Sequence, residues 1–139
     1  MNGLSLFANV GIAETYLHKE GIDIVVANEL LEDRAAFYQH LYPDCHMICG
    51  DITNEEVFNS IIIEAKQKNV EFILATPPCQ GMSIAGYMLP EDPRNYLITY
   101  AVEAIKKLGP RPESGRAFSG FYPPTAYSAS WRQSRSGTY

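Results

Sequence analysis

Short apolar runs alternate with stretches of helical spacing over the first 108 residues, and this alternation limits the fold more than any other feature of the chain. Four runs have strand character, and we expect strands over residues 4–8, 22–27, 46–49 and 71–75. Apolar residues recur at three- and four-residue intervals between and after them, which predicts helices over residues 12–20, 30–42, 54–69 and 94–108. Such alternation predicts an α/β fold with a doubly wound parallel sheet, in which right-handed crossovers give the strand order 3-2-1-4.

One helix start is marked by a local signal. Thr53-Asn54-Glu55-Glu56 fits a capping box, in which Thr53 caps the helix and Glu56 lies three residues further on. We therefore expect Thr53 to be the N-cap residue.

Composition suits one domain. The chain has 139 residues, of which 46% are apolar, enough for a modest core. It has no run of 18 apolar residues and no basic segment before the apolar residues at its start, so we expect neither a transmembrane helix nor a signal peptide. Three cysteines in an α/β pattern favour free thiols in a reducing compartment, so we expect a cytoplasmic protein without a membrane partner.

The character of the chain changes after residue 108. Residues 1–108 carry 7 Lys and Arg against 15 Asp and Glu, whereas residues 109–139 carry 4 Arg and 1 Glu. The acidic part is poorly suited to holding a polyanion. The last part contains no Leu, Ile or Val, so we expect residues 109–139 to form an irregular or disordered tail without a strand or helix face. It is either a native tail or the product of a shifted reading frame.

Three positions at predicted strand ends suit an adenosine site, because ligands of doubly wound sheets bind at the carboxyl ends of the strands. Gly11 permits close approach of a ligand to the backbone. Glu29 lies 18 residues further on and offers a carboxylate to ribose hydroxyls, and Asp51 offers a polar group to an adenine edge. Each residue also has a structural alternative. Gly11 can be only a turn glycine, Glu29 can be a solvated carboxylate in the first turn of a helix, and Asp51 can cap the loop into the next helix.

The fourth predicted strand runs into Thr76-Pro77-Pro78-Cys79-Gln80. Two prolines cannot continue a sheet, and the second holds the first away from helical angles, so we expect a stiff extended loop that presents the Cys79 thiol at the carboxyl end of the strand. The alternative is a buried, inert thiol. Cys45, His46 and Cys49 flank one short strand without a second ligand pair, so we expect no metal site.

Pro78-Cys79-Gln80, followed by Ser83 and Gly86, resembles the catalytic-loop signature of the DNA (cytosine-5) methyltransferases. Phe7-Ala8-Asn9-Val10-Gly11 resembles the Phe-x-Gly-x-Gly motif of that family, with Asn9 in place of the first glycine. Asn tolerates left-handed backbone angles better than most residues, so the turn is retained.

Two further segments extend the resemblance. Asn28-Glu29 resembles the ribose-binding acid of the family, and Gly50-Asp51-Ile52 resembles its adenine-side aspartate. The cofactor that this resemblance implies is S-adenosylmethionine, not a dinucleotide. The absence of the Gly-x-Gly-x-x-Gly fingerprint of dinucleotide-binding proteins agrees with this. The residues that the resemblance assigns to the cofactor are Phe7, Asn9, Gly11, Glu29, Asp51, Ile52 and Pro78.

The resemblance also implies the reaction. Cys79 is the implied nucleophile that adds to carbon 6 of a cytosine flipped out of DNA, so that carbon 5 attacks the methyl group of the cofactor. An amino-methyltransferase is the closest competitor, but Thr76-Pro77-Pro78-Cys79 lacks the acidic or amide residue and the aromatic of that class.

The resemblance covers residues 4–108, the amino-terminal part of the family's catalytic domain. Family members continue with a Glu-Asn-Val strand, an Arg-x-Arg strand, a target-recognition region and a final helix, and we find none of these in the sequence. We therefore expect these residues alone to be inactive. The alternatives are a non-catalytic fragment, half of a split enzyme that binds cofactor and needs a complementing subunit or self-association, and a relative acting on transfer RNA.

Overall fold

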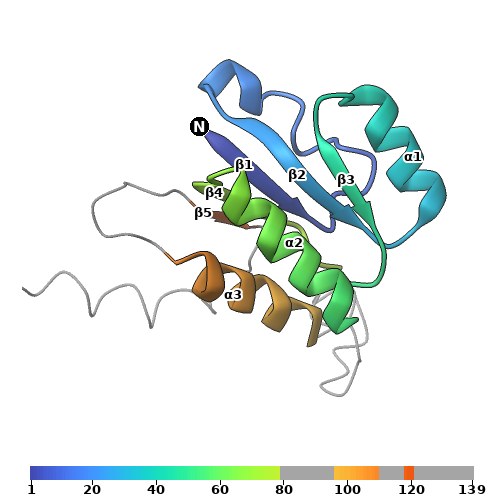
Figure 1. Ribbon diagram of the computed structural model, residues 1–139. Coiled ribbons are helices and arrows are strands. Elements are labelled where there is room, and N and C mark those ends of the chain that lie inside the picture. Colours follow the sequence, from blue (N-terminus) through green and yellow to red (C-terminus); the bar gives the residue numbers. More distant parts are fainter. Residues whose placement is uncertain (79–95, 110–117, 121–139) are drawn as a thin grey trace, which may run out of the picture.

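The computed structural model contains a parallel sheet with helices on both faces (Figure 1). It describes residues 1–78, 96–109 and 118–120. Its strands are β1 (Asn2–Leu6), β2 (Asp23–Glu29), β3 (His46–Cys49), β4 (Phe72–Ala75) and β5 (Phe118–Gly120). Its helices are the 3-10 helix η1 (Leu17–Glu20), α1 (Glu32–Leu41), α2 (Glu55–Gln67) and α3 (Leu97–Leu108). The strands lie in the order β3-β2-β1-β4-β5, and each pairing is parallel. The predicted fold class and the order 3-2-1-4 are confirmed.

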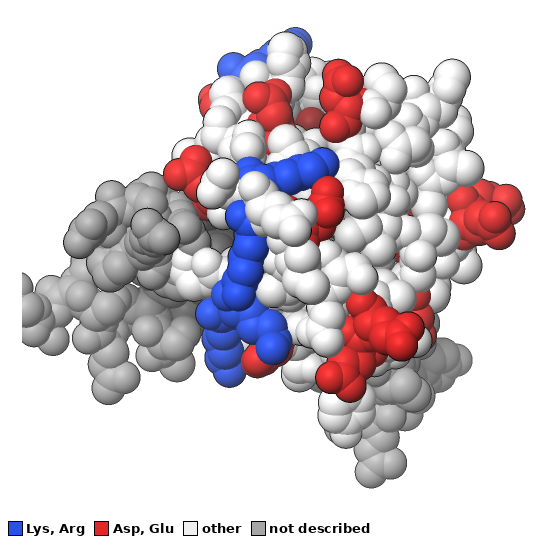
Figure 2. Space-filling view, viewed as in Figure 1, with Lys and Arg blue, Asp and Glu red and all other residues white. Residues whose placement is uncertain are grey.

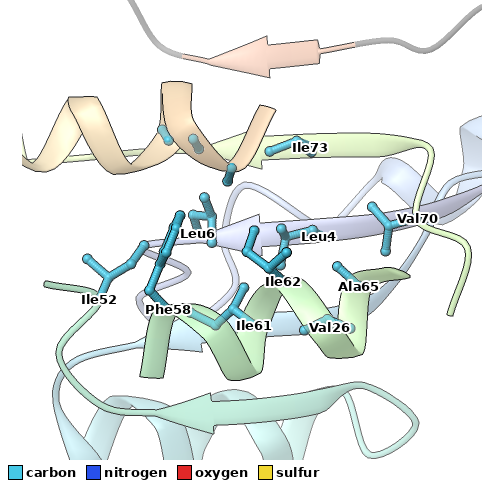
Figure 3. Close-up of a cluster of buried hydrophobic side chains, with 13 residues drawn as sticks. Leu4, Leu6, Val26, Ile52, Phe58, Ile61, Ile62, Ala65, Val70 and Ile73 are labelled. Atoms are coloured by element: carbon cyan, nitrogen blue, oxygen red, sulfur yellow. The ribbon is translucent and has the colours of Figure 1, made fainter. Parts of the chain in front are cut away.

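Helices α2 and α3 cover one face of the sheet. Leu4 and Leu6 of β1 point to this face because alternate side chains of a strand share a side. They pack against the apolar stripe of α2, in which residues recur at helical spacing (Figure 3). Each such side chain contributes about 1.5–3 kcal/mol when fully buried. The labelled members of this cluster are Leu4, Leu6, Val26, Ile52, Phe58, Ile61, Ile62, Ala65, Val70 and Ile73.

The opposite face, covered by α1, is more polar. Ser5 of β1 points to this face, is completely buried and donates a hydrogen bond to the Glu14 carboxylate. Glu14 is itself 4% exposed, and burial raises its pKa. Tyr38 of α1 is fully buried on the same side and packs with Ala27 and Cys45. This face therefore holds a buried carboxyl group beneath the segment that follows β1.

The helix predicted over residues 12–20 is wrong over most of its length. The chain makes turns up to Tyr16 and forms only η1. The apolar residues that suggested a buried face, Ile12 and Tyr16, are 78% and 69% exposed, because the segment instead places Glu14 on the sheet. Gly21 closes the segment, as predicted, with a left-handed φ of 73°.

Two other expectations differ from the structure. The N-cap of α2 is Asn54, not Thr53: its side-chain oxygen accepts from the Glu56 and Val57 N–H groups, whereas Thr53 bonds to Asp51. The tail was expected to contain no strand, but β5 pairs with β4 in parallel register. A ladder of main-chain groups requires no side-chain period, so Phe118-Ser119-Gly120 can form one.

Candidate active site

The carboxyl ends of four neighbouring strands meet at one edge of the sheet. The Thr76 hydroxyl donates to the Phe7 carbonyl at 3.0 Å, although 69 residues separate them. The Ala8 N–H donates to the Asn28 carbonyl at 3.0 Å, and the Gly50 N–H to the Glu29 carbonyl at 2.9 Å. The structure thus brings together the segments in which the sequence placed Gly11, Glu29, Asp51 and Pro78.

Glu29 links two of these segments. It is the last residue of β2 and is 6% exposed, so it is not a solvated carboxylate in the first turn of a helix. One carboxylate oxygen accepts from the Asn9 N–H at 2.8 Å and the other from the Leu31 N–H at 3.0 Å. A carboxylate has about four acceptor positions, so both oxygens retain capacity for ligand hydroxyls.

The turn after β1 is held in an uncommon backbone conformation. Phe7 and Asn9 have φ values of 59° and 53°. Asn9 adopts the left-handed conformation that the sequence predicted for it, and the bond from its N–H to Glu29 holds it there. Phe7 has no such intrinsic tolerance, and for an ordinary L-residue this region costs about 1–2 kcal/mol. Strained backbone of this kind concentrates at functional sites.

Gly11 has a structural role that the sequence did not reveal. Its φ is 81°, and a Cβ at this position would lie 2.3 Å from Cε2 of Tyr42 and 3.1 Å from the Tyr38 ring. The Tyr42 hydroxyl donates to the Gly11 carbonyl at 2.7 Å. The close approach that this glycine allows is therefore to two tyrosine rings, and its predicted contact with a ligand stays a prediction. Tyr42 lies 31 residues downstream, so no local pattern indicated the contact.

Side-chain hydrogen bonds from β2 hold the end of β3 and the segment that follows it. The Asn28 amide donates to the carbonyls of Ile48 and Gly50 at 2.8 and 3.1 Å. Asp51 is exposed, and one of its oxygens accepts from the Thr53 N–H and hydroxyl, so it caps this loop, as the structural alternative proposed. Ile52 is 3% exposed and belongs to the core, which leaves only its main chain for a ligand.

The predicted nucleophile lies outside the described residues. Pro78 is exposed and immediately precedes Cys79. Of the other cysteines, Cys45 is buried, and burial raises its pKa to about 11, which keeps it an unreactive thiol. Cys49 is exposed. The His46 Nδ1 atom lies 2.8 Å from a Glu64 carboxylate oxygen. Over the part of the chain that the structure describes, no group of three His, Cys, Asp or Glu side chains is arranged to hold a metal ion.

A family model, that of the C-5 cytosine-specific DNA methylases, matches residues 1–112. The chain belongs to this family. A type II methyltransferase of Avibacterium volantium, M1.HgaI, is 49% identical to this chain over 113 aligned residues, and the match covers 78% of this chain and 32% of that protein. M.XorII of Xanthomonas oryzae pv. oryzae, also a type II methyltransferase, is 27% identical to this chain over 112 aligned residues. That match covers 78% of this chain and 26% of M.XorII.

A solved structure agrees with these sequence relatives. It is of an Escherichia coli protein described as a DNA modification methyltransferase encoded within a prophage, and it matches this chain with a TM-score of 0.61 at 26% identity. The match covers 79% of this chain and 30% of that one. The chain therefore spans about a quarter to a third of the length of these relatives and of this structure.

Charge on the chain is unevenly distributed. Figure 2 shows acidic side chains in separate groups across the visible face, whereas most of the basic ones gather over the carboxyl-terminal ends of α2 and α3. Lys66 lies in the last turn of α2, and Lys106 and Lys107 in that of α3. Cations at these positions complement the helix dipoles, which is a sufficient structural explanation for them. Among the described residues, no helix is long and apolar enough to cross a membrane.

Proposed function

We propose that this chain contributes the cofactor-binding segments and the nucleophile of a DNA (cytosine-5)-methyltransferase of restriction–modification type. The observation that supports this most strongly is the meeting, at one sheet edge, of the turn after β1, Glu29 and the segment ending at Pro78. A cofactor bound beside Glu29 would then lie next to the loop that carries Cys79. The relatives named type II methyltransferases favour DNA as the substrate over transfer RNA.

The residues at this edge fit S-adenosylmethionine. When bound, the cofactor supplies an electrophilic methyl group. The Glu29 carboxylate is preorganised by two main-chain N–H groups and retains acceptor positions for the ribose hydroxyls. Asp51 is exposed one strand away, with one oxygen not engaged by Thr53, and suits an amino group at the adenine edge. Phe7, Asn9, Gly11, Ile52 and Pro78 would contribute main-chain or wall contacts.

Cys79 is the proposed nucleophile. Its thiolate would form a bond to carbon 6 of the target cytosine, and the displaced electron pair would make carbon 5 nucleophilic toward the methyl group. Carbon 5 would bond to the methyl group as the methyl–sulfur bond breaks, which leaves S-adenosylhomocysteine. Loss of the carbon-5 proton to a base and departure of the thiolate would then restore the double bond and free the enzyme. The cytosine must leave the DNA stack to reach the thiol.

A second contribution must come from residues beyond the matched region. The matched region covers only 32% of M1.HgaI, and the net charge of residues 1–108 is −8 (7 − 15). A polyanion requires basic contacts that this part does not provide in quantity. We propose that these 139 residues alone bind cofactor but do not methylate DNA, and that DNA recognition comes from residues beyond the matched region, in the same protein or in a complementing polypeptide. The proposed substrate places the protein in a bacterial cytoplasm.

Complementation tests this function. The chain is mixed with the portion of M1.HgaI that follows its matched region, and transfer of a tritiated methyl group to mixed-sequence DNA is measured. We expect no incorporation with either part alone, incorporation with both, and none when Cys79→Ser replaces the wild type. Equal incorporation by the Cys79→Ser mixture would refute the role of Cys79.

Calorimetry tests the cofactor site separately. We expect Glu29→Gln to weaken binding of S-adenosylmethionine at least about tenfold, because the amide places a donor against main-chain donors and removes a charged acceptor. Glu32→Gln is the matched control, since Glu32 is exposed in the first turn of α1. Equal affinities for both variants would contradict the assignment of Glu29.

A further inference from the structure

Tyr42 holds the turn after β1 through a hydrogen bond to its main chain. It follows α1 directly, and its ring packs on that of Tyr38 with centroids 4.8 Å apart. Its hydroxyl donates to the Gly11 carbonyl at 2.7 Å, a short and well-formed bond. The Thr15 hydroxyl is 3.5 Å from the same carbonyl but 2.8 Å from that of Ile12, so Tyr42 is the principal donor to Gly11.

This bond determines where the next peptide N–H points. The carbonyl of Gly11 and the N–H of Ile12 belong to one planar trans peptide, so they point in opposite directions. Because the carbonyl is held toward Tyr42, the Ile12 N–H is held away from it. Among the described residues this N–H has no acceptor, and Ile12 is 78% exposed. The turn thus holds an unbonded main-chain donor three residues after Asn9, whose own N–H is bonded to Glu29.

We propose that Tyr42 is a positioning residue for the cofactor. Its hydroxyl keeps the Gly11–Ile12 peptide in the orientation that offers the Ile12 N–H to an acceptor group of the bound ligand. This inference rests on the proposed function, since it takes the ligand to be S-adenosylmethionine at this edge. Gly11 is required for the same reason: only a residue without a Cβ leaves room for the Tyr42 ring.

Tyr38 offers a matched comparison. It is the second ring against Gly11, is fully buried and stacks on Tyr42. Its hydroxyl lies beside the Cys45 thiol, and among the described residues no hydrogen bond joins it to the turn after β1. Tyr42→Phe and Tyr38→Phe therefore both keep a ring beside the glycine, but only Tyr42→Phe removes the bond to the turn.

The test uses the 139-residue chain and three measurements: amide hydrogen exchange of residues 9–12 without ligand, the Kd for S-adenosylmethionine, and the urea midpoint. We expect Tyr42→Phe to speed exchange at residues 9–12 severalfold and to raise the Kd about three- to tenfold, as for one lost hydrogen bond. We expect Tyr38→Phe to leave the exchange and the Kd near wild type. The urea midpoint shows whether either variant is merely less stable.

The outcomes separate this inference from the function on which it rests. If the wild-type chain does not bind S-adenosylmethionine, the proposed cofactor function is overturned and the positioning role with it. If the wild type binds but Tyr42→Phe binds equally well, only the role of Tyr42 is overturned. If both variants weaken binding alike, ring packing rather than the hydroxyl governs the turn, which also overturns the inference.

Discussion

Gly11→Ala should be among the most damaging single-atom changes in the chain, and Gly21→Ala is its matched control. The two glycines have similar positive φ values, 81° and 73°. In both, alanine would meet left-handed strain of about 1–2 kcal/mol, offset by about 0.4–1 kcal/mol from the lower entropy of the unfolded chain. They differ in their surroundings, since a Cβ at Gly21 meets nothing within 4 Å.

At Gly11 the new methyl group would lie 2.3 Å from Cε2 of Tyr42, a rigid ring that is held by its hydroxyl and by stacking on Tyr38. Overpacking typically costs about 1–3 kcal/mol, and loss of the bond to the Gly11 carbonyl adds about 0.5–1.5 kcal/mol. We therefore expect Gly11→Ala to lower the free energy of unfolding by about 2–4 kcal/mol more than Gly21→Ala does. This is a large part of the ~5–15 kcal/mol that stabilises an ordinary domain.

Urea denaturation followed by circular dichroism measures the difference. With a slope of about 1–3 kcal/mol per molar, the midpoint of Gly11→Ala should lie about 1 M or more below that of Gly21→Ala. Adding Tyr42→Ala should remove most of the extra cost, because the ring that causes the clash is then absent. Equal midpoints for the two alanine variants would refute the argument that Gly11 is required by the tyrosine rings.

Three other predictions follow from buried or capping groups. Burial raises the pKa of Glu14, so the folded state binds the carboxyl proton more tightly than the unfolded state does. The free energy of unfolding should therefore fall as the pH rises above the ordinary pKa of a glutamate. Urea titrations at several pH values measure this slope, and Glu14→Gln should flatten it. Asn54→Ala should cost about 1 kcal/mol of unfolding free energy because it removes the N-cap of α2, whereas a larger loss for Thr53→Ala would mean that the cap was misassigned. The chain should self-associate in sedimentation at high concentration, because parallel sheets are normally covered and several large apolar side chains are exposed here, and a monomer over the whole concentration range would contradict this.

The fold could be predicted because its determinants are local. β-branched runs and helical spacing mark most elements to within two or three residues, and the handedness of crossovers supplies the strand order. The same rule placed Glu29 and Asp51 at one edge, because each follows or ends a parallel strand. The position of these two carboxylates at the carboxyl edge of the sheet could therefore be predicted from the sequence.

The parts that were missed depend on contacts between distant residues. Nothing near Gly11 indicates that Tyr42 lies against it, and nothing near Glu14 indicates that its side chain reaches Ser5 across the turn. Thr53 and Asn54 are both good caps, and the choice between them depends on Asp51, which engages Thr53 first. β5 was missed because main-chain pairing leaves no signature in three residues.

The central place of β1 also bears on synthesis. β1 is flanked by β2 on one side and β4 on the other, and the Thr76 N–H and hydroxyl bond to the carbonyls of Leu6 and Phe7. During synthesis on a ribosome, β1 emerges some seventy residues before β4, its second neighbour, exists. Until then one ladder of main-chain groups on β1 stays open to solvent, so the junction between the turn after β1 and the end of β4 can form only after β4 has been made.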